Sequence, residues 1–454
     1  MAVERPDKPG RRPNARLRAL LAEAGWSNEQ CARAVNAVGA EIGLVLRYDR
    51  TSVAHWLSGT QPKPPVPQLV AETLSRRLGR VMTPVAAGFA QPAGAAELPR
   101  PRTSSHAAAV RALGSLAGRD ADPVERAALA GEPYRALGAP PPWSGGRAGL
   151  RGAARRELAR VGGAEVDLLR GAVRHFAAAM DVHGGGHARP ALAHYLADTA
   201  TTWLHAPGED RVHRQLGTQS AYLVFILARM HSDMGCHGIA QRYLYLALDL
   251  AREAHDRVAW AISLRALAAQ ALHLDHRRTA LQYAQAAVDA LPAQVGDAVR
   301  AFALAQLAVT HAALGERGAA LASLDRAEEH GRRAGVGDPF GDYPSGALSF
   351  QKAEVHRELG DLRAAARALQ RSTRERPAHD RRGLALTLAR RAELLLRSGR
   401  VGEACEVWTQ FLDAGGGLRS HSVVTAVRTM RGCLEPLSRH PSARALLERE
   451  RLLG

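Results

Sequence analysis

Aromatic residues make up only 5% of this chain of 454 residues. Aromatic and β-branched residues are typical of β-strands, whereas Ala, Leu and Arg, which are abundant here, favour helices. The composition therefore predicts an all-α protein. The chain is too long for one ordinary domain, so two or three are expected.

Long apolar runs and cysteines are scarce as well. No apolar run reaches the roughly 18 residues that a membrane-spanning helix needs, and the first residues, MAVERPDKPGRR, lack the apolar core of a signal peptide. We therefore expect a cytoplasmic protein with no membrane partner. The cysteines form no CxxC pair, which is typical of reduced thiols and not of a zinc site; they are Cys31, Cys236, Cys405 and Cys433.

Common catalytic motifs are missing too, because the sequence contains no GxxxxGK, no GxSxG and no HExxH. The stretch DVHGGGHARP (residues 181–190) holds His183 and His187, but its three glycines would leave metal ligands poorly fixed. A turn between two helices is expected there. We accordingly expect no enzyme activity, no metal and no cofactor.

The positive charge is carried almost wholly by arginine, since the only lysines are Lys8, Lys63 and Lys352. The net charge of +17 is concentrated at the front: residues 1–90 hold 13 basic against 7 acidic residues, and residues 91–164 hold 11 against 6. A basic region suits a polyanionic partner such as nucleic acid. A coding bias toward arginine would produce part of the same excess.

The stretch DRTSVAHWLSGTQPKPP (residues 49–65) predicts a short, firmly ended helix. Asp49 is a good N-cap, and Val53 and Trp56 lie three residues apart and so share one face. Gly59 and the prolines that follow end the helix. The result is an apolar back and a small polar front that fits a major groove.

Other helices are expected on both sides of this one, over residues 14–24 and 66–78, with Ser27 and Gln30 forming a capping box for a third. Helix, helix, short helix, proline-rich loop and helix is the order of a compact helix-turn-helix bundle. Residues 1–90 are therefore predicted to form one domain.

The run Ser27-Asn28-Glu29-Gln30-Cys31-Ala32, followed by Ser52-Val53-Ala54-His55-Trp56-Leu57-Ser58-Gly59, resembles the XRE-type, or repressor-like, helix-turn-helix family. The sequence departs from that family in having VGAEIGLVLRYD where a tight turn is usual. The resemblance implies double-stranded DNA as partner. It implies base contacts by Arg50, Thr51, Ser52 and His55, and phosphate contacts by Asn28, Arg47 and Lys63. A solvated helix face would carry similar residues.

Residues 91–164 are rich in Ala, Gly, Pro and Arg. Such a segment buries little apolar surface to offset the entropy of ordering, so a flexible linker is predicted. Short helices are expected within it near residues 106–117 and 123–130.

From residue 165 to 454 the chain repeats a pattern of apolar helix, tight turn and second helix. The turn positions are spaced by 40, 40, 45 and 39 residues; they are Gly235, Asp275, Gly315, Gly360 and Gly399. One hairpin cannot bury its own apolar face, so repeated hairpins stack into an α-solenoid. The units resemble tetratricopeptide repeats, with further pairs expected at 165–204 and 420–450.

The early repeats hold most of the large rings, with arginines among them. This combination suits a pocket for a peptide or an anionic small molecule, formed by Tyr222, Arg229, Arg242, Tyr243 and Trp260. Rings that only fill the space between helices would give the same pattern.

A repressor-like domain before a helical-repeat array resembles regulators of Gram-positive bacteria, and the Ala/Arg/Gly-rich composition is similar to that of actinobacteria such as Streptomyces. The resemblance implies a cytoplasmic, nucleoid-associated transcription regulator of differentiation or secondary metabolism. It also implies a homodimer whose array senses a peptide, small molecule or protein partner. The alternative is an interaction scaffold that acts through its repeats without specific DNA binding.

Overall fold

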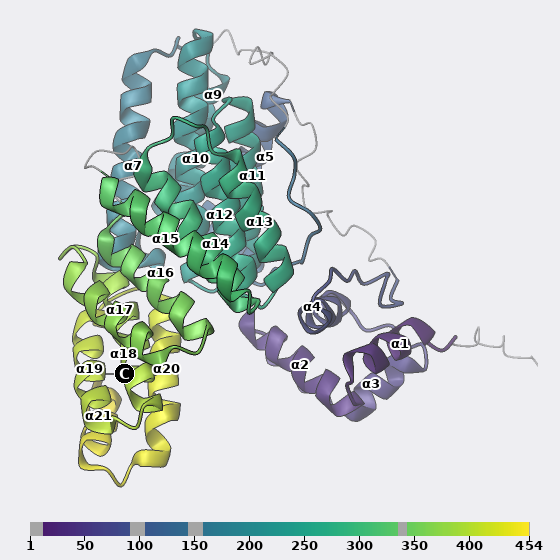
Figure 1. The fold of residues 1–454 in the computed structure, drawn as a ribbon. Coiled ribbons are helices and arrows are strands. Elements are labelled where there is room, and N and C mark those ends of the chain that lie inside the picture. Colours follow the sequence, from purple (N-terminus) through teal and green to yellow (C-terminus); the bar gives the residue numbers. More distant parts are fainter. Residues whose placement is uncertain (1–11, 91–104, 144–157, 335–342, 454) are drawn as a thin grey trace, which may run out of the picture.

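The computed structural model describes residues 12–90, 105–143, 158–334 and 343–453. Within these residues the regular elements are all helices, which confirms the all-α prediction. A small bundle at the N-terminus, which we call the head, projects from a large stack of paired helices (Figure 1). Within the same residues no helix is long and apolar enough to cross a membrane.

The head consists of four helices, of which α2 and α3 begin at the predicted caps Ser27 and Asp49. The expected capping box of Ser27 with Gln30 is present, and Asp49 forms a second one with Ser52 that the sequence analysis did not predict. The apolar faces meet in one core that includes Val53 and Trp56. The helices are α1 (Ala15–Ala24), α2 (Asn28–Glu41), α3 (Arg50–Leu57) and α4 (Val66–Leu78).

The stretch VGAEIGLVLRYD, for which a longer helix or a loop was open, extends α2 and then forms a packed loop. Asn36 on α2 donates from Nδ2 to the Tyr48 carbonyl (2.8 Å) and accepts from the Tyr48 N–H (3.0 Å). The Tyr48 ring meets Trp56 edge-on, with centroids 5.1 Å apart. The loop is therefore fixed at both sides, and the start of α3 has a set position on the head.

The short helices expected within residues 91–164 are present as α5 (His106–Ala121) and α6 (Pro123–Ala130), and an extended segment follows them to residue 143. The predicted flexible linker is nevertheless packed wherever the structure describes it. Leu113 and Leu129 are completely buried in the same core as the first repeat helices. The prediction failed because the apolar face of α5 gains its partner only from helices far along the chain. Its remaining residues, 91–104 and 144–157, lie outside the described part of the chain.

The repeat region begins with the pair α7 (Gly163–His183) and α8 (Gly185–Tyr195), followed by a π-helical turn η1 (Leu196–Ala200) and α9 (Thr201–His205). We call residues 163–453 the array. Its hairpins are α10 (Asp210–Asp233) with α11 (His237–Glu253), α12 (Arg257–His273) with α13 (Arg277–Ala290), α14 (Asp297–Ala313) with α15 (Arg317–Arg333), α16 (Ser345–Glu358) with α17 (Leu362–Glu375), and α18 (Arg381–Arg397) with α19 (Val401–Gly415).

All five turn positions predicted from the sequence have left-handed backbones, with φ between 63° and 80°, and Asp275 adopts this conformation without being glycine. The last helices are α20 (His421–Leu434), the 3-10 turn η2 (Glu435–Leu437) and α21 (Pro441–Leu453). The paired helices stack into the expected solenoid (Figure 1).

The array curls until its last helices meet its first. Arg382 on α18 forms a 2.7 Å ion pair with the fully buried carboxylate of Asp233 at the end of α10. The Gly186 N–H donates to the Arg419 carbonyl (2.8 Å), and the Arg419 N–H donates to the His183 carbonyl (2.8 Å). The glycines of HGGGH permit this contact, since a Cβ on Gly184 would lie 2.7 Å from the Arg419 carbonyl oxygen.

Candidate nucleic-acid interface and array cavity

Helix α3 separates its buried and exposed residues as the sequence predicts. Val53 and Trp56 are 0% and 4% exposed and hold the helix on the head. Of the expected DNA contacts, Arg47, Arg50, Thr51, His55 and Lys63 are exposed, whereas Asn28 and Ser52 are half-buried. Arg50, Thr51 and His55 therefore lie on the face of α3 that points away from the core. Arg47 and Lys63 lie before and after α3 in the chain.

Ser52 is engaged in capping α3. Its Oγ donates to Asp49 Oδ1 (2.8 Å), and its backbone N–H donates to the same oxygen (2.8 Å). These hydrogen bonds lower the pKa of Asp49. The structure thus gives Ser52 a structural role that fixes the first turn of α3.

Other arginines of the head are paired with carboxylates. Arg76 pairs with Glu41 (2.7 Å) and Glu72 (2.9 Å), and Arg80 pairs with Glu23 (2.6 Å). In contrast, Arg47, Arg50 and Lys63 form no ion pair with any residue that the structure describes. The unpaired positive charge of the head therefore includes the residues that border and begin α3.

The head meets the array through α4, leaving α3 exposed. Glu72 on α4 accepts a hydrogen bond from His276 Nε2 at the start of α13 (2.7 Å), and both side chains are buried. Tyr134 from the segment after α6 packs on the His276 ring, with centroids 5.3 Å apart. In Figure 1, α4 lies nearer to the array than α3 does.

The comparisons with known proteins concern mainly the head. Residues 17–90 match a family model described as the SP15 N-terminal domain. No helix-turn-helix or tetratricopeptide family model matches the chain, and no curated protein matches it. The matched region begins within α1 and includes α2, α3 and α4.

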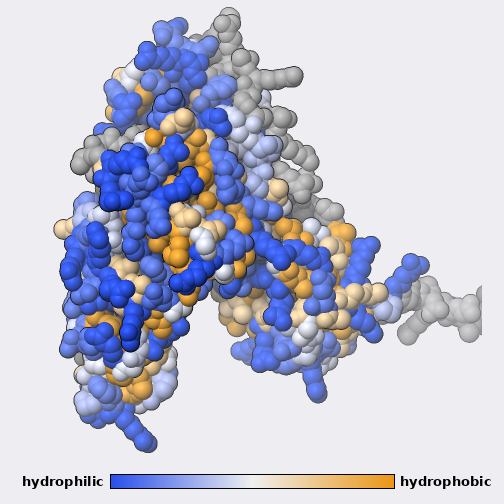
Figure 2. Space-filling model, viewed as in Figure 1, coloured by the Kyte–Doolittle hydropathy of each residue, from blue (hydrophilic) through white to orange (hydrophobic). Residues whose placement is uncertain are grey.

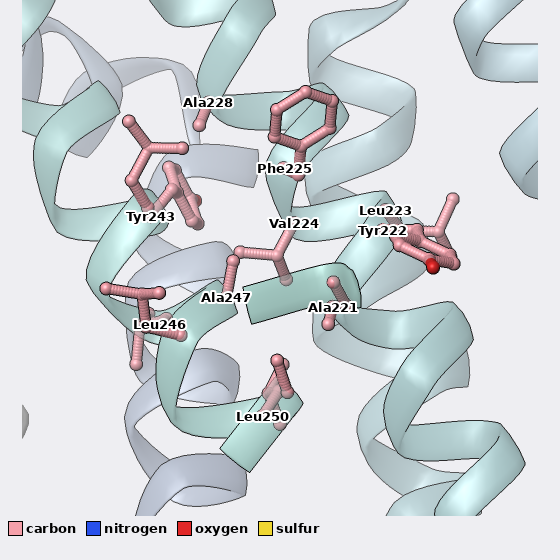
Figure 3. Close-up of a cluster of buried hydrophobic side chains, with 14 of the residues drawn as sticks. Ala221, Tyr222, Leu223, Val224, Phe225, Ala228, Tyr243, Leu246, Ala247 and Leu250 are labelled. Carbon is pink, nitrogen blue, oxygen red and sulfur yellow. The ribbon is translucent and has the colours of Figure 1, made fainter. Parts of the chain in front are cut away.

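The rings expected to line a ligand pocket lie in the core of the array instead. Tyr222, Tyr243 and Trp260 are 3%, 0% and 1% exposed, and Figure 3 shows both tyrosines among apolar side chains of α10 and α11. The sequence pattern could not distinguish a ring on the concave face from a ring packed between helices. In a solenoid each helix has neighbours on both sides, so rings at several helical positions become buried.

The segment that was predicted to be a linker covers three of the five predicted ligand residues, namely Arg242, Tyr243 and Trp260. Tyr243 donates its hydroxyl to Asp120 Oδ2 on α5 (3.0 Å). Trp143 meets Trp260 edge-on, with centroids 5.3 Å apart, and Arg242 pairs with Glu132 (2.8 Å). A ligand therefore has no access to Tyr243 or Trp260 in this arrangement.

Of the five predicted ligand residues, Arg229 is the one that lines the cavity on the inner side of the array. The cavity has a volume of about 250 Å³. Residues that the sequence analysis did not select complete the polar part of the lining; they are Ser232, Asp233, His237, Arg265, Gln270, His273, Arg382 and Ser422. The sequence does single out Arg265, because this charged residue interrupts the apolar run WAISLRALAAQALHL.

Proposed function

We propose that the protein is a sequence-specific DNA-binding transcription regulator of the cytoplasm and nucleoid, whose array senses a signal and pairs two copies of the chain. The observation that carries the proposal is α3, a short capped helix with a buried apolar back and an exposed front of Arg50, Thr51 and His55. A helix of this size fits the major groove of B-form DNA.

The charge of the head supports the same function. Unpaired Arg47, Arg50 and Lys63 can contact phosphates without first breaking an ion pair. The Asp49 cap fixes where α3 begins, and the Tyr48 contacts fix the preceding loop. A rigid reading helix loses little entropy on binding.

The test is selection of bound sequences from a random double-stranded DNA pool by the purified full-length protein. We expect enrichment of a preferred sequence, and an affinity that falls steeply as salt rises because bound phosphates release their counterions. Binding that shows no sequence preference, or no binding at low salt, would contradict the proposal and favour the interaction scaffold.

A further inference from the structure

The cavity of the array holds more positive charge than its own carboxylates neutralise. Three arginines line it from different helices: Arg229 on α10, Arg265 on α12 and Arg382 on α18. Arg382 is neutralised by Asp233, which also accepts hydrogen bonds from the Ser420 hydroxyl (2.8 Å) and the Gly185 N–H (2.8 Å). This pair is complete and joins the two ends of the array.

Arg229 is only partly balanced. It forms no ion pair with a described residue, and its guanidinium lies 5.9 Å from the centre of the Phe225 ring. Burial lowers its pKa, and the nearby carboxylate of Asp181 opposes that effect. Asp181 is itself buried, which raises its pKa.

Among the residues that the structure describes, no carboxylate pairs with Arg265. Its guanidinium lies 3.9 Å from the centre of the Phe302 ring, and its Nε is buried with no hydrogen-bond partner among the described residues. Burial, together with the neighbouring charge of Arg229, lowers its pKa to about 10, and Tyr343 opposes this shift. Arg265 is half-buried, and a cation that loses water without gaining a carboxylate among the described residues is costly, so this arrangement favours an added anion.

The remaining lining suits an apolar body attached to that anion. Met180, Phe225, Leu244, Ala266 and Ala269 form the apolar part of the wall. The volume of about 250 Å³ exceeds the roughly 30 Å³ of one water in the liquid several times, and falls near the lower limit of small-molecule pockets. The space therefore fits a small organic molecule better than a folded peptide segment.

We propose that this cavity binds a small amphipathic anion, with a carboxylate or phosphate group between Arg229 and Arg265 and an apolar body against Phe225 and Leu244. The site gives a chemical class to the signal of the proposed regulator, and in that respect it rests on the proposed function. Because α18 and α20 complete the wall, a bound anion connects the early repeats with the end of the array.

The test is thermal unfolding and titration calorimetry of the full-length protein without DNA, using hexanoate, hexyl phosphate, acetate, inorganic phosphate and hexan-1-ol as probes. We expect hexanoate or hexyl phosphate to raise the Tm by about 3 °C or more at a concentration well above its Kd. Hexan-1-ol should have no such effect. Whichever of hexanoate and hexyl phosphate binds more tightly identifies the preferred headgroup. If acetate or inorganic phosphate raises the Tm as much as the hexyl compound does, the apolar body does not contribute to binding.

The decisive variant is Arg265→Met, which keeps the side-chain length and removes the charge. Without ligand its Tm should equal or exceed that of the wild type, because an unpaired buried charge is gone, while the response to the anions should fall at least tenfold in affinity. Arg278→Met, at an exposed arginine of α13, is the matched control and should respond as the wild type does.

Three results would overturn the site: no response to any anion, an equal response to hexan-1-ol, or an unchanged response in Arg265→Met. A large loss of Tm in Arg265→Met without ligand would instead show that this arginine stabilises the fold. These measurements involve no DNA, so failure of the site and failure of the DNA-binding proposal are observed separately.

Discussion

At the scale of single residues, Arg50 and His55 combine exposure with a position beside the buried Val53 and Trp56. Their side chains can be removed without opening the core of the head. Arg50→Ala and His55→Ala should each weaken specific DNA binding by about 1–3 kcal/mol while the circular dichroism spectrum and Tm stay unchanged. The measurement is a titration of the selected DNA sequence.

The matched control for these variants is Arg317→Ala, which removes an exposed arginine from α15 of the array. It should bind the selected sequence as the wild type does. If Arg50→Ala and His55→Ala also bind normally, α3 is not the helix that reads the DNA.

A second residue-scale prediction concerns pH. Burial, together with the neighbouring His273, lowers the pKa of His237 from its ordinary 6.5 to about 3. Below pH 6.5 the unfolded chain therefore binds a proton that the folded chain does not bind. Stability that is fully present above pH 6.5 should be lost as the pH falls, by up to about 1.4 kcal/mol per pH unit from this residue.

The comparison of wild type with His237→Asn in urea unfolding between pH 7 and pH 5 measures this contribution. The variant should show a shallower loss of stability as the pH falls. Burial raises the pKa of Asp249 to about 7, so that carboxyl stabilises the fold as the pH falls, but its effect is common to both proteins and cancels. Equal slopes would contradict the prediction.

At the scale of elements, the contact between the start of α8 and the end of α10 depends on glycine. A Cβ at Gly185 would lie 2.6 Å from the Met230 carbonyl oxygen, whereas a Cβ at Gly171 on α7 would have nothing within 4 Å. Gly185→Ala should destabilise the protein by about 1–3 kcal/mol through overpacking. Gly171→Ala should be neutral or stabilising by up to about 1 kcal/mol.

The measurement is chemical unfolding of both variants, followed by hydrogen exchange of the residues around Asp233 and Arg419. Faster exchange there in Gly185→Ala alone would confirm that the contact of α8 with α10 holds Asp233 in place for its ion pair with Arg382. Equal stability of both variants would show that α8 shifts without cost.

A buried polar group also explains why α5 packs on the array at one position. Asp120 on α5 is 0% exposed and accepts hydrogen bonds from His231 Nε2 (2.7 Å) and the Tyr243 hydroxyl (3.0 Å). Burial lowers the pKa of His231 and raises that of Tyr243. This buried polar group fixes α5 against α10 and α11 at one position.

At the scale of the whole molecule, the head is attached to the array by the buried Glu72–His276 pair, with α3 exposed. Under the proposed function one such head would contact only a few base pairs, and DNA-binding proteins of that kind gain affinity by two-fold pairing on a palindromic site. The face of the array in Figure 2 has an apolar band between hydrophilic edges, which offers surface for pairing.

We predict a homodimer held through the array. Light scattering of the full-length protein should give a protein mass of twice the chain mass of 48.6 kDa. This should hold for the free protein and, after the mass of the DNA is subtracted, for the complex with the selected DNA. The bound sequence should contain two half-sites about one helical turn apart. A monomer under both conditions would contradict this prediction.

The sequence alone determined the local structure. Asp49 and Ser27 gave the starts of α3 and α2, the spacing of Val53 and Trp56 gave the buried face of α3, and the recurring turn residues gave the hairpins of the array. Each of these features depends on residues within a few positions of one another, whose chemistry is visible in the order of the chain.

Only the tertiary structure decided which surfaces stay free. The sequence could not show that Asp120 and Trp143 cover Tyr243 and Trp260, since these contacts join residues more than a hundred positions apart. It could not show that Arg265 lies near Arg229 with no carboxylate partner among the described residues, or that Arg382 takes Asp233 when the array curls onto itself. Burial and charge balance depend on every neighbour in space, and sequence periodicity reports only the neighbours along one helix.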